Sequence, residues 1–251
     1  MKKILMVLCL MGIASLLEAQ QFTKEQIDDY RTKWAREYFT KKGLPAPDGG
    51  VQVVSSSQIS SLDKNEIQKN KEEYLKNGFI SKYNDRAKDL LNFEIFAQHA
   101  FKNKFNIFDE STHLRHSIDE LKMAYTFVGI PSNLNAKIIG VSPYLTFIKN
   151  EGWVGAVQFF NLDGIGICAF TENNIRLSHG SVMLAREDIS EYINGKPAMT
   201  DVIGNIKSGY VYHIDWYGSD FFRELECATQ EYLPLTLKKV VELANKIDSA
   251  S

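Results

Sequence analysis

Apolar residues in the first half of the chain recur every three or four positions, which is the spacing of amphipathic helices. A capping box and a hydrophobic staple over residues 22–27 predict a helix start, and further helices are expected over residues 62–77 and 81–104. The last of these has the widest apolar arc, so we expect it at the centre of a helical bundle. A second capping box at Ser117 predicts another helix, which ends before Pro131.

Beyond residue 131 the apolar period shortens to two, which indicates β-strands. Residues 210–228 predict a hairpin, because Gly218-Ser219 suits a two-residue type II′ turn. The expected register gathers apolar residues on one face and polar residues on the other. The predicted opposite pairs are Trp216 with Phe221, Tyr212 with Leu225, Tyr210 with Cys227, Val211 with Glu226 and His213 with Glu224.

Two further turns follow from the same reasoning. Asp163-Gly164 predicts a hairpin in which Phe159 lies opposite Cys168 and both faces are largely apolar, as in strands near the centre of a sheet. Asn194-Gly195 predicts another tight turn. After these strands, an apolar stripe at helical spacing predicts a closing helix over residues 234–248.

These patterns predict an α+β protein in which N-terminal helices pack with a C-terminal antiparallel β-sheet and a C-terminal helix closes the structure. We expect a single domain over residues 20–251, with a helical half at residues 22–129, a sheet half at residues 131–230 and the closing helix at residues 234–248. Residues 44–60 are rich in Pro, Gly and Ser, and we expect them to form a linker.

Residues 1–19 have the layout of a secretory signal peptide. Lys2 and Lys3 precede an almost wholly apolar run over residues 4–17, which is too short to cross a bilayer as a helix. An uncleaved anchor is the alternative. The sequence therefore predicts an exported bacterial protein, periplasmic or secreted, with no stable membrane span after signal removal.

The composition narrows the possible partners. Acidic and basic residues nearly balance, with a formal net charge of −2. The sequence has no basic patch of the kind that binds nucleic acid, so we expect no nucleic-acid partner. The chain has no phosphate-binding glycine loop and no nucleophile elbow. Residues 164–169 match the letters of a dinucleotide fingerprint, but they follow a turn and continue as a strand instead of opening a helix. We therefore expect no cofactor.

Cys168 and Cys227 are the two cysteines that remain after signal cleavage. Export permits their oxidation, and the expected registers place both on inward, apolar faces. We predict a disulfide between them, and two buried thiols are the alternative.

Polar side chains offer two candidate sites. On the polar face of the 210–228 hairpin, His213, Asp215 and Glu224 could act as an acid/base group, although cross-strand pairs of this kind also occur as surface salt bridges. His113 and His116 are weak metal-ligand candidates, because a solvated loop would have the same composition.

Aromatic residues offer a third candidate site. Trp153, Tyr210, Tyr212 and Trp216 could line a ligand groove on a concave sheet, and plain core packing is the alternative. The sequence then favours an exported, non-enzymatic protein that binds a protein partner or a small apolar ligand. A secreted hydrolase using carboxylate and histidine chemistry is the alternative function.

Overall fold

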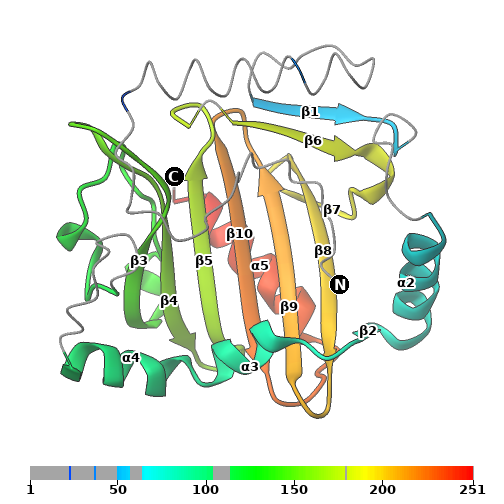
Figure 1. Ribbon diagram of the computed structural model, residues 1–251. Helices are drawn as coiled ribbons and strands as arrows, with labels where there is room; N and C mark the ends of the chain where they lie inside the picture. The colour runs from blue at the N-terminus through cyan, green and yellow to red at the C-terminus, as the bar shows by residue number, and fades with distance from the viewer. Residues whose placement is uncertain are drawn as a thin grey trace.

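An eight-stranded mixed β-sheet forms the centre of the molecule (Figure 1). The computed structural model describes residues 50–56, 64–103, 114–178 and 180–250, together with the single positions 23 and 37. In the main sheet the strand order is β2-β8-β9-β10-β5-β4-β3, and β7 also pairs with β8. The strands are β1 (Gly50–Val54), β2 (Ile80–Ser81), β3 (Lys137–Ile148), β4 (Gly152–Leu162), β5 (Gly166–Asn174), β6 (Ser181–Ala185), β7 (Glu191–Ile193), β8 (Lys196–Asn205), β9 (Gly209–Tyr217) and β10 (Phe221–Thr229).

Helices and a small second sheet cover the two faces of the main sheet. The α-helices are α2 (Lys64–Asn77), α3 (Asp85–Leu91), α4 (Phe93–Asn103) and α5 (Thr236–Asp248), and single 3₁₀ turns form η2 (Ile118–Glu120), η3 (Ser132–Leu134) and η4 (Arg186–Asp188). In Figure 1, α5 lies behind β9 and β10, whereas α3 crosses the opposite face near one end of the strands. The two-stranded sheet β1-β6 lies near their other end. We call these two faces the α5 face and the α3 face.

The largest apolar cluster lies on the α5 face. Successive strand residues point to opposite sides, so Tyr212, Ile214 and Trp216 of β9 all point toward α5 and are fully buried. Across from them, α5 presents one buried stripe that includes Val240 and Ala244. The predicted closing helix is therefore present with nearly the expected bounds.

The predicted fold class, α+β with N-terminal helices packed with a C-terminal antiparallel sheet, is wrong. The N-terminal half contributes strands to both sheets, and these strands pair in parallel, β1 with β6 and β2 with β8. Strand β1 lies inside residues 44–60, which were expected to form a linker. Val51 of this strand pairs with Val182 of β6 and packs in the same apolar cluster, and this tertiary pairing outweighs the local Pro, Gly and Ser signal.

The helices of the N-terminal half are shorter than predicted. Residues 81–104 form two helices that break at Asn92, and in the second helix Ile95 and Phe96 are 58% and 59% exposed. The capping box at Ser117 forms, but only the 3₁₀ turn η2 follows it. The chain then bonds to β4 through Lys122 and Ala124, so sheet pairing replaces the expected helix.

The two predicted hairpins exist, each with a different register. In β9–β10 the loop residues are Ser219 and Asp220, since Gly218 N donates to Phe221 O at 2.9 Å. All pairs therefore shift by two residues, Tyr212 lying opposite Cys227, and a shift of two leaves every side chain on its expected face. In β4–β5 the shift is one residue, so Cys168 lies opposite Phe160. Both faces there are apolar, and the burial pattern could not select the register.

The turn at Asn194-Gly195 joins β7 to β8 as predicted. Both residues have positive φ, 46° and 81°, which Asn and Gly tolerate best. The predicted signal peptide lies outside the described residues, as does the first helix apart from positions 23 and 37. The single domain over residues 20–251 stays a prediction. No helix in the described ranges is long and apolar enough to cross a membrane.

Candidate functional site

A strip of polar residues crosses the α3 face at mid-height. In one row, Asp201 of β8 lies opposite His213 of β9, which lies opposite Glu226 of β10. In the next row on the same face, Asp215 lies opposite Glu224, and Glu224 lies opposite Thr171 of β5. We call the residues of these two rows the polar strip. Strand alternation and register alone bring these side chains together.

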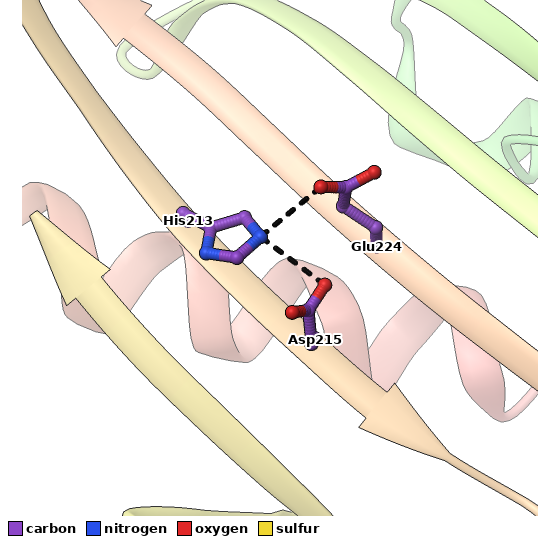
Figure 2. A group of neighbouring side chains, drawn as sticks. All are labelled: His213, Asp215 and Glu224. Atoms are coloured by element: carbon purple, nitrogen blue, oxygen red, sulfur yellow. Dashed lines mark hydrogen bonds and ion pairs between the residues drawn. The ribbon is translucent and has the colours of Figure 1, made fainter. Parts of the chain in front are cut away.

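The imidazole of His213 is the centre of the strip. Its Nε2 atom lies 3.1 Å from Asp215 Oδ1 and 3.2 Å from Glu224 Oε1, and Figure 2 shows both carboxylates meeting this one nitrogen. On the other side of the ring, His213 Nδ1 lies 3.6 Å from Asp201 Oδ2. The three ligand atoms of His213, Asp215 and Glu224 all lie within 4.8 Å of one another.

Apolar clusters bound the strip on both sides. Toward one end of the strands, Ala87 and Leu90 of α3 pack on the sheet beside the strip. Toward the other end, Val182 and Leu184 of β6 pack on the sheet. The side chain of Asp215 is only 1% exposed, whereas those of His213 and Glu224 are 15% and 25% exposed. The strip is therefore largely dehydrated, and solvent reaches it from the Glu224 side.

Hydrogen bonds from neighbouring residues hold the carboxylates of Glu226 and Asp215 in place. Arg86 of α3 donates from Nε to Glu226 Oε2 at 2.6 Å, and the hydroxyl of Tyr217 donates to Asp215 Oδ2 at 3.4 Å. Because Tyr217 bonds to Oδ2 of Asp215, the other oxygen, Oδ1, is left facing His213.

Burial and mutual interaction shift the pKa values of the strip. Burial disfavours the imidazolium, but the charge of Asp215 and hydrogen bonds with Asp201, Asp215 and Glu224 outweigh it and hold the pKa of His213 well above its usual value. Burial raises the pKa of Asp215 to about 6. Burial acts in the same direction on Glu224, but the hydrogen bond and charge of His213 prevail and lower its pKa. Burial and the nearby Glu224 raise the pKa of Glu226.

The donor set of the strip suits a divalent metal ion. One imidazole nitrogen and two carboxylate oxygens are common ligands of Zn²⁺ and related ions. Metal–ligand bonds of about 2.0–2.2 Å place neighbouring ligand atoms about 3–3.5 Å apart, and the two distances from His213 Nε2 fall in this range. A metal-ligating histidine usually donates its other N–H to a carboxylate, and Asp201 lies on that side of the ring.

The structure thus brings together the predicted polar site, His213, Asp215 and Glu224. The predicted direct pairing of His213 with Glu224 is replaced by a diagonal contact, because of the two-residue register shift. The role of Asp201 was missed, since no turn signal fixed the register of β8 against β9. Once that register is known, strand alternation places Asp201 beside His213.

Three of the four predicted aromatic ligand-binding residues belong to the apolar cluster on the α5 face, and Trp153 lies apart from them. Tyr212 and Trp216 are fully buried beneath α5. Tyr210 meets Phe79 edge to face at 5.1 Å, while Trp153 meets Phe147 at the far end of β4. These placements are those of core residues, and a ligand-binding role for them stays a prediction.

The candidate metal pair His113 and His116 is only partly described. His113 lies outside the described residues. The ring of His116 stacks on that of Phe101 at 3.8 Å, and its backbone N–H donates to Glu120. A metal role for this pair stays untested.

The predicted disulfide is present. Cys168 and Cys227 lie directly opposite each other on β5 and β10, with Cα atoms 4.0 Å apart and sulfurs bonded. Both side chains are fully buried on the α5 face. The bond links two central strands that are 59 residues apart in the sequence.

A second charged cluster lies on the α5 face and was not predicted. Arg223 donates to Glu172 and to Asp248 of α5, both at 2.6 Å. Asp248 also accepts from Lys196 at 2.5 Å and from the indole N–H of Trp216 at 3.0 Å. These contacts tie the end of α5 to four strands of the sheet, β5, β8, β9 and β10.

Comparison with known proteins identifies no relative from which a function could be inferred, so the proposed function rests on the site alone. No family model, no curated protein and no solved structure matches the chain.

Proposed function

We propose that this protein binds a divalent metal ion of the zinc class through His213 Nε2, Asp215 Oδ1 and Glu224 Oε1. The observation that carries the proposal is the convergence of both carboxylates on one imidazole nitrogen. A single Nε2–H cannot donate with good geometry to two acceptors at once, whereas a metal ion accepts all three groups as ligands.

The charges of the three residues support the same conclusion. Two carboxylates share one imidazole in a largely dehydrated place, so they retain negative charge even when His213 is protonated. Burying unbalanced charge is costly, and a divalent cation offsets it. Neutral His213 would then bind the metal through Nε2 and donate from Nδ1 to Asp201.

Three protein ligands leave coordination positions for water or for another molecule. Structural zinc sites usually have four protein ligands, whereas catalytic and exchangeable sites keep an open position. We therefore favour reversible binding of the metal, alone or with a small partner molecule. The open position also supports a second candidate function, a metal-assisted hydrolase. A bound metal lowers the pKa of a coordinated water, which can then attack a substrate as hydroxide near neutral pH.

We place this function in an oxidising compartment outside the cytoplasm. The Cys168–Cys227 disulfide supports this location, since such bonds persist mainly in exported proteins. The predicted signal peptide supports it from the sequence.

Calorimetric titration of metal-free protein with Zn²⁺ tests the proposal. We expect one strong site per chain, a loss of affinity beyond about 100-fold in His213→Ala, and a loss of about 10-fold in Asp201→Asn, as for partners of metal ligands. His99→Ala is the matched control, because His99 is an exposed histidine of α4. Equal zinc affinity in wild type and His213→Ala would refute the proposal.

A further inference from the structure

Asn173 of β5 carries a buried oxygen without a partner. Within the described ranges, its Oδ1 is the one buried side-chain polar atom that lacks a hydrogen bond. The residue is only 1% exposed. A buried acceptor left unpaired destabilises the fold, so each such atom in a native structure requires an explanation.

The register places Asn173 beside the polar strip. Thr171 of β5 lies opposite Glu224 and hydrogen-bonds to it, and Asn173 lies two residues further along β5 on the same face. Asn173 is therefore a diagonal neighbour of Glu224, within reach of a ligand that bridges the two side chains.

No polar side chain lies directly opposite Asn173 on the strands at either side. Its cross-strand neighbours are Phe222 on β10 and Gly155 on β4. Phe222 belongs to the apolar cluster of Val182 and Leu184, and glycine has no side chain at all. The amide oxygen thus stands at the boundary between the apolar cluster and the candidate metal ligands.

We propose that Asn173 Oδ1 accepts a hydrogen bond from a small amide-type ligand that also coordinates the metal at His213, Asp215 and Glu224. Such a ligand has an oxygen for the open coordination position and an adjacent N–H for Asn173. This inference rests on the proposed metal site, and it names the class of molecule that completes that site. Asn173 then acts as a specificity-determining residue, and its unpaired oxygen is explained by the ligand it receives.

Two matched probes test this assignment on the zinc-loaded protein. Acetohydroxamate offers two oxygens to the metal and one N–H to Asn173, whereas its N-methyl analogue keeps the oxygens and lacks the N–H. We expect wild-type protein to bind acetohydroxamate about 10-fold more tightly than the N-methyl analogue, because a factor of this size corresponds to one well-placed hydrogen bond. In Asn173→Leu this preference should disappear while zinc affinity stays within about twofold.

The melting temperatures of Asn173 variants show whether Asn173 recognises a ligand or supports the fold. Asn173→Leu removes a buried Oδ1 that has no hydrogen-bond partner in the protein, so its melting temperature should equal or exceed that of wild type. Asn173→Ala serves as the second variant if Leu packs poorly. Asn161→Leu is the control, because Asn161 lies on β4 near Glu94, away from the strip.

Three results would overturn the inference. The first is equal binding of both probes by wild-type protein, and the second is a preference that survives in both Asn173 variants. The third is a wild-type protein that binds no zinc, which would refute the proposed function and this inference with it. The zinc titration, made before either probe is added, distinguishes that failure from the first two.

Discussion

Arg223 and Glu224 are neighbours in sequence, but they belong to charged clusters on opposite faces of the same strand. Arg223 points to the α5 face, where two cations and two carboxylates pair in a closed network with side chains that are 0–5% exposed, apart from Lys196 at 35%. Glu224 points to the α3 face, where two carboxylates converge on one imidazole and solvent reaches the site from the Glu224 side. The balanced network stabilises the fold, and the unbalanced strip is arranged to receive a cation.

The largest expected effect is on the balanced network. Arg223→Met leaves Glu172 and Asp248 buried without their shared cation, so we expect a loss of about 3–5 kcal/mol in the free energy of unfolding. Arg176→Met is the matched control, because the Arg176–Asp220 pair is 3.7 Å apart and exposed, and should lose at most about 1 kcal/mol. Urea unfolding measures both. Equal losses would show that the network is not a structural element.

The disulfide should contribute nearly as much, and on the same face. Closing a loop of 59 residues is worth about 4 kcal/mol in the chain-entropy model. We therefore expect the double variant Cys168→Ala/Cys227→Ala to unfold at a lower urea concentration, with unchanged zinc affinity. A double variant as stable as wild type would contradict this expectation.

How far the sequence predicted the fold depends on which residues carried local signals. The alternation in residues 210–228 fixed which side chains face α5, and a two-residue register error left that result intact. The same alternation placed His213, Asp215 and Glu224 on one face and Cys227 on the other. Asn194-Gly195 and the stripe of α5 were equally local and equally clear.

Non-local pairing explains what the sequence could not predict. Strand β1 is stabilised by its parallel pairing with β6, some 130 residues away, and no local pattern records that partner. The apolar arc of residues 81–104 predicted the centre of a helical bundle, yet α3 and α4 pack on one face of the sheet and leave Ile95 and Phe96 of α4 more than half exposed. The contacts of Asp201 with His213 and of Arg223 with Asp248 likewise depend on tertiary registers.

Acid should weaken the balanced network in a specific pH range. Burial opposes the charge of Asp248, but hydrogen bonds from Lys196, Asn194 and Trp216 prevail and lower its pKa. A carboxyl whose pKa is lowered by folding adds stability at pH values above its pKa in the unfolded chain, which is about 4. This stability is lost as the pH falls through the pKa of the carboxyl in the folded protein.

Asp248→Asn tests this dependence. The difference in unfolding free energy between wild type and Asp248→Asn should be largest near pH 6 and shrink as the pH falls from 4 to 3. Urea unfolding at each pH measures the difference. A difference that stays constant would mean that Asp248 does not titrate with folding.

The smallest effect on stability is expected at the polar strip. Because burial raises the pKa of Asp215 to about 6, ionisation of this carboxyl above that pH opposes folding. Asp215→Asn should therefore change the free energy of unfolding at pH 7.5 by at most about 1 kcal/mol, in the stabilising direction. Zinc should raise the melting temperature of wild type and leave that of the variant unchanged. A strongly destabilised variant would indicate that the strip is structural.

The most direct test of the metal site is anomalous X-ray diffraction from crystals of the zinc-loaded protein. We expect one strong peak on the α3 face, about 2.0–2.2 Å from His213 Nε2, Asp215 Oδ1 and Glu224 Oε1, with Asp201 bonded to His213 Nδ1. A zinc ion bound elsewhere, or a strip that keeps only its hydrogen bonds in the presence of excess zinc, would contradict the account.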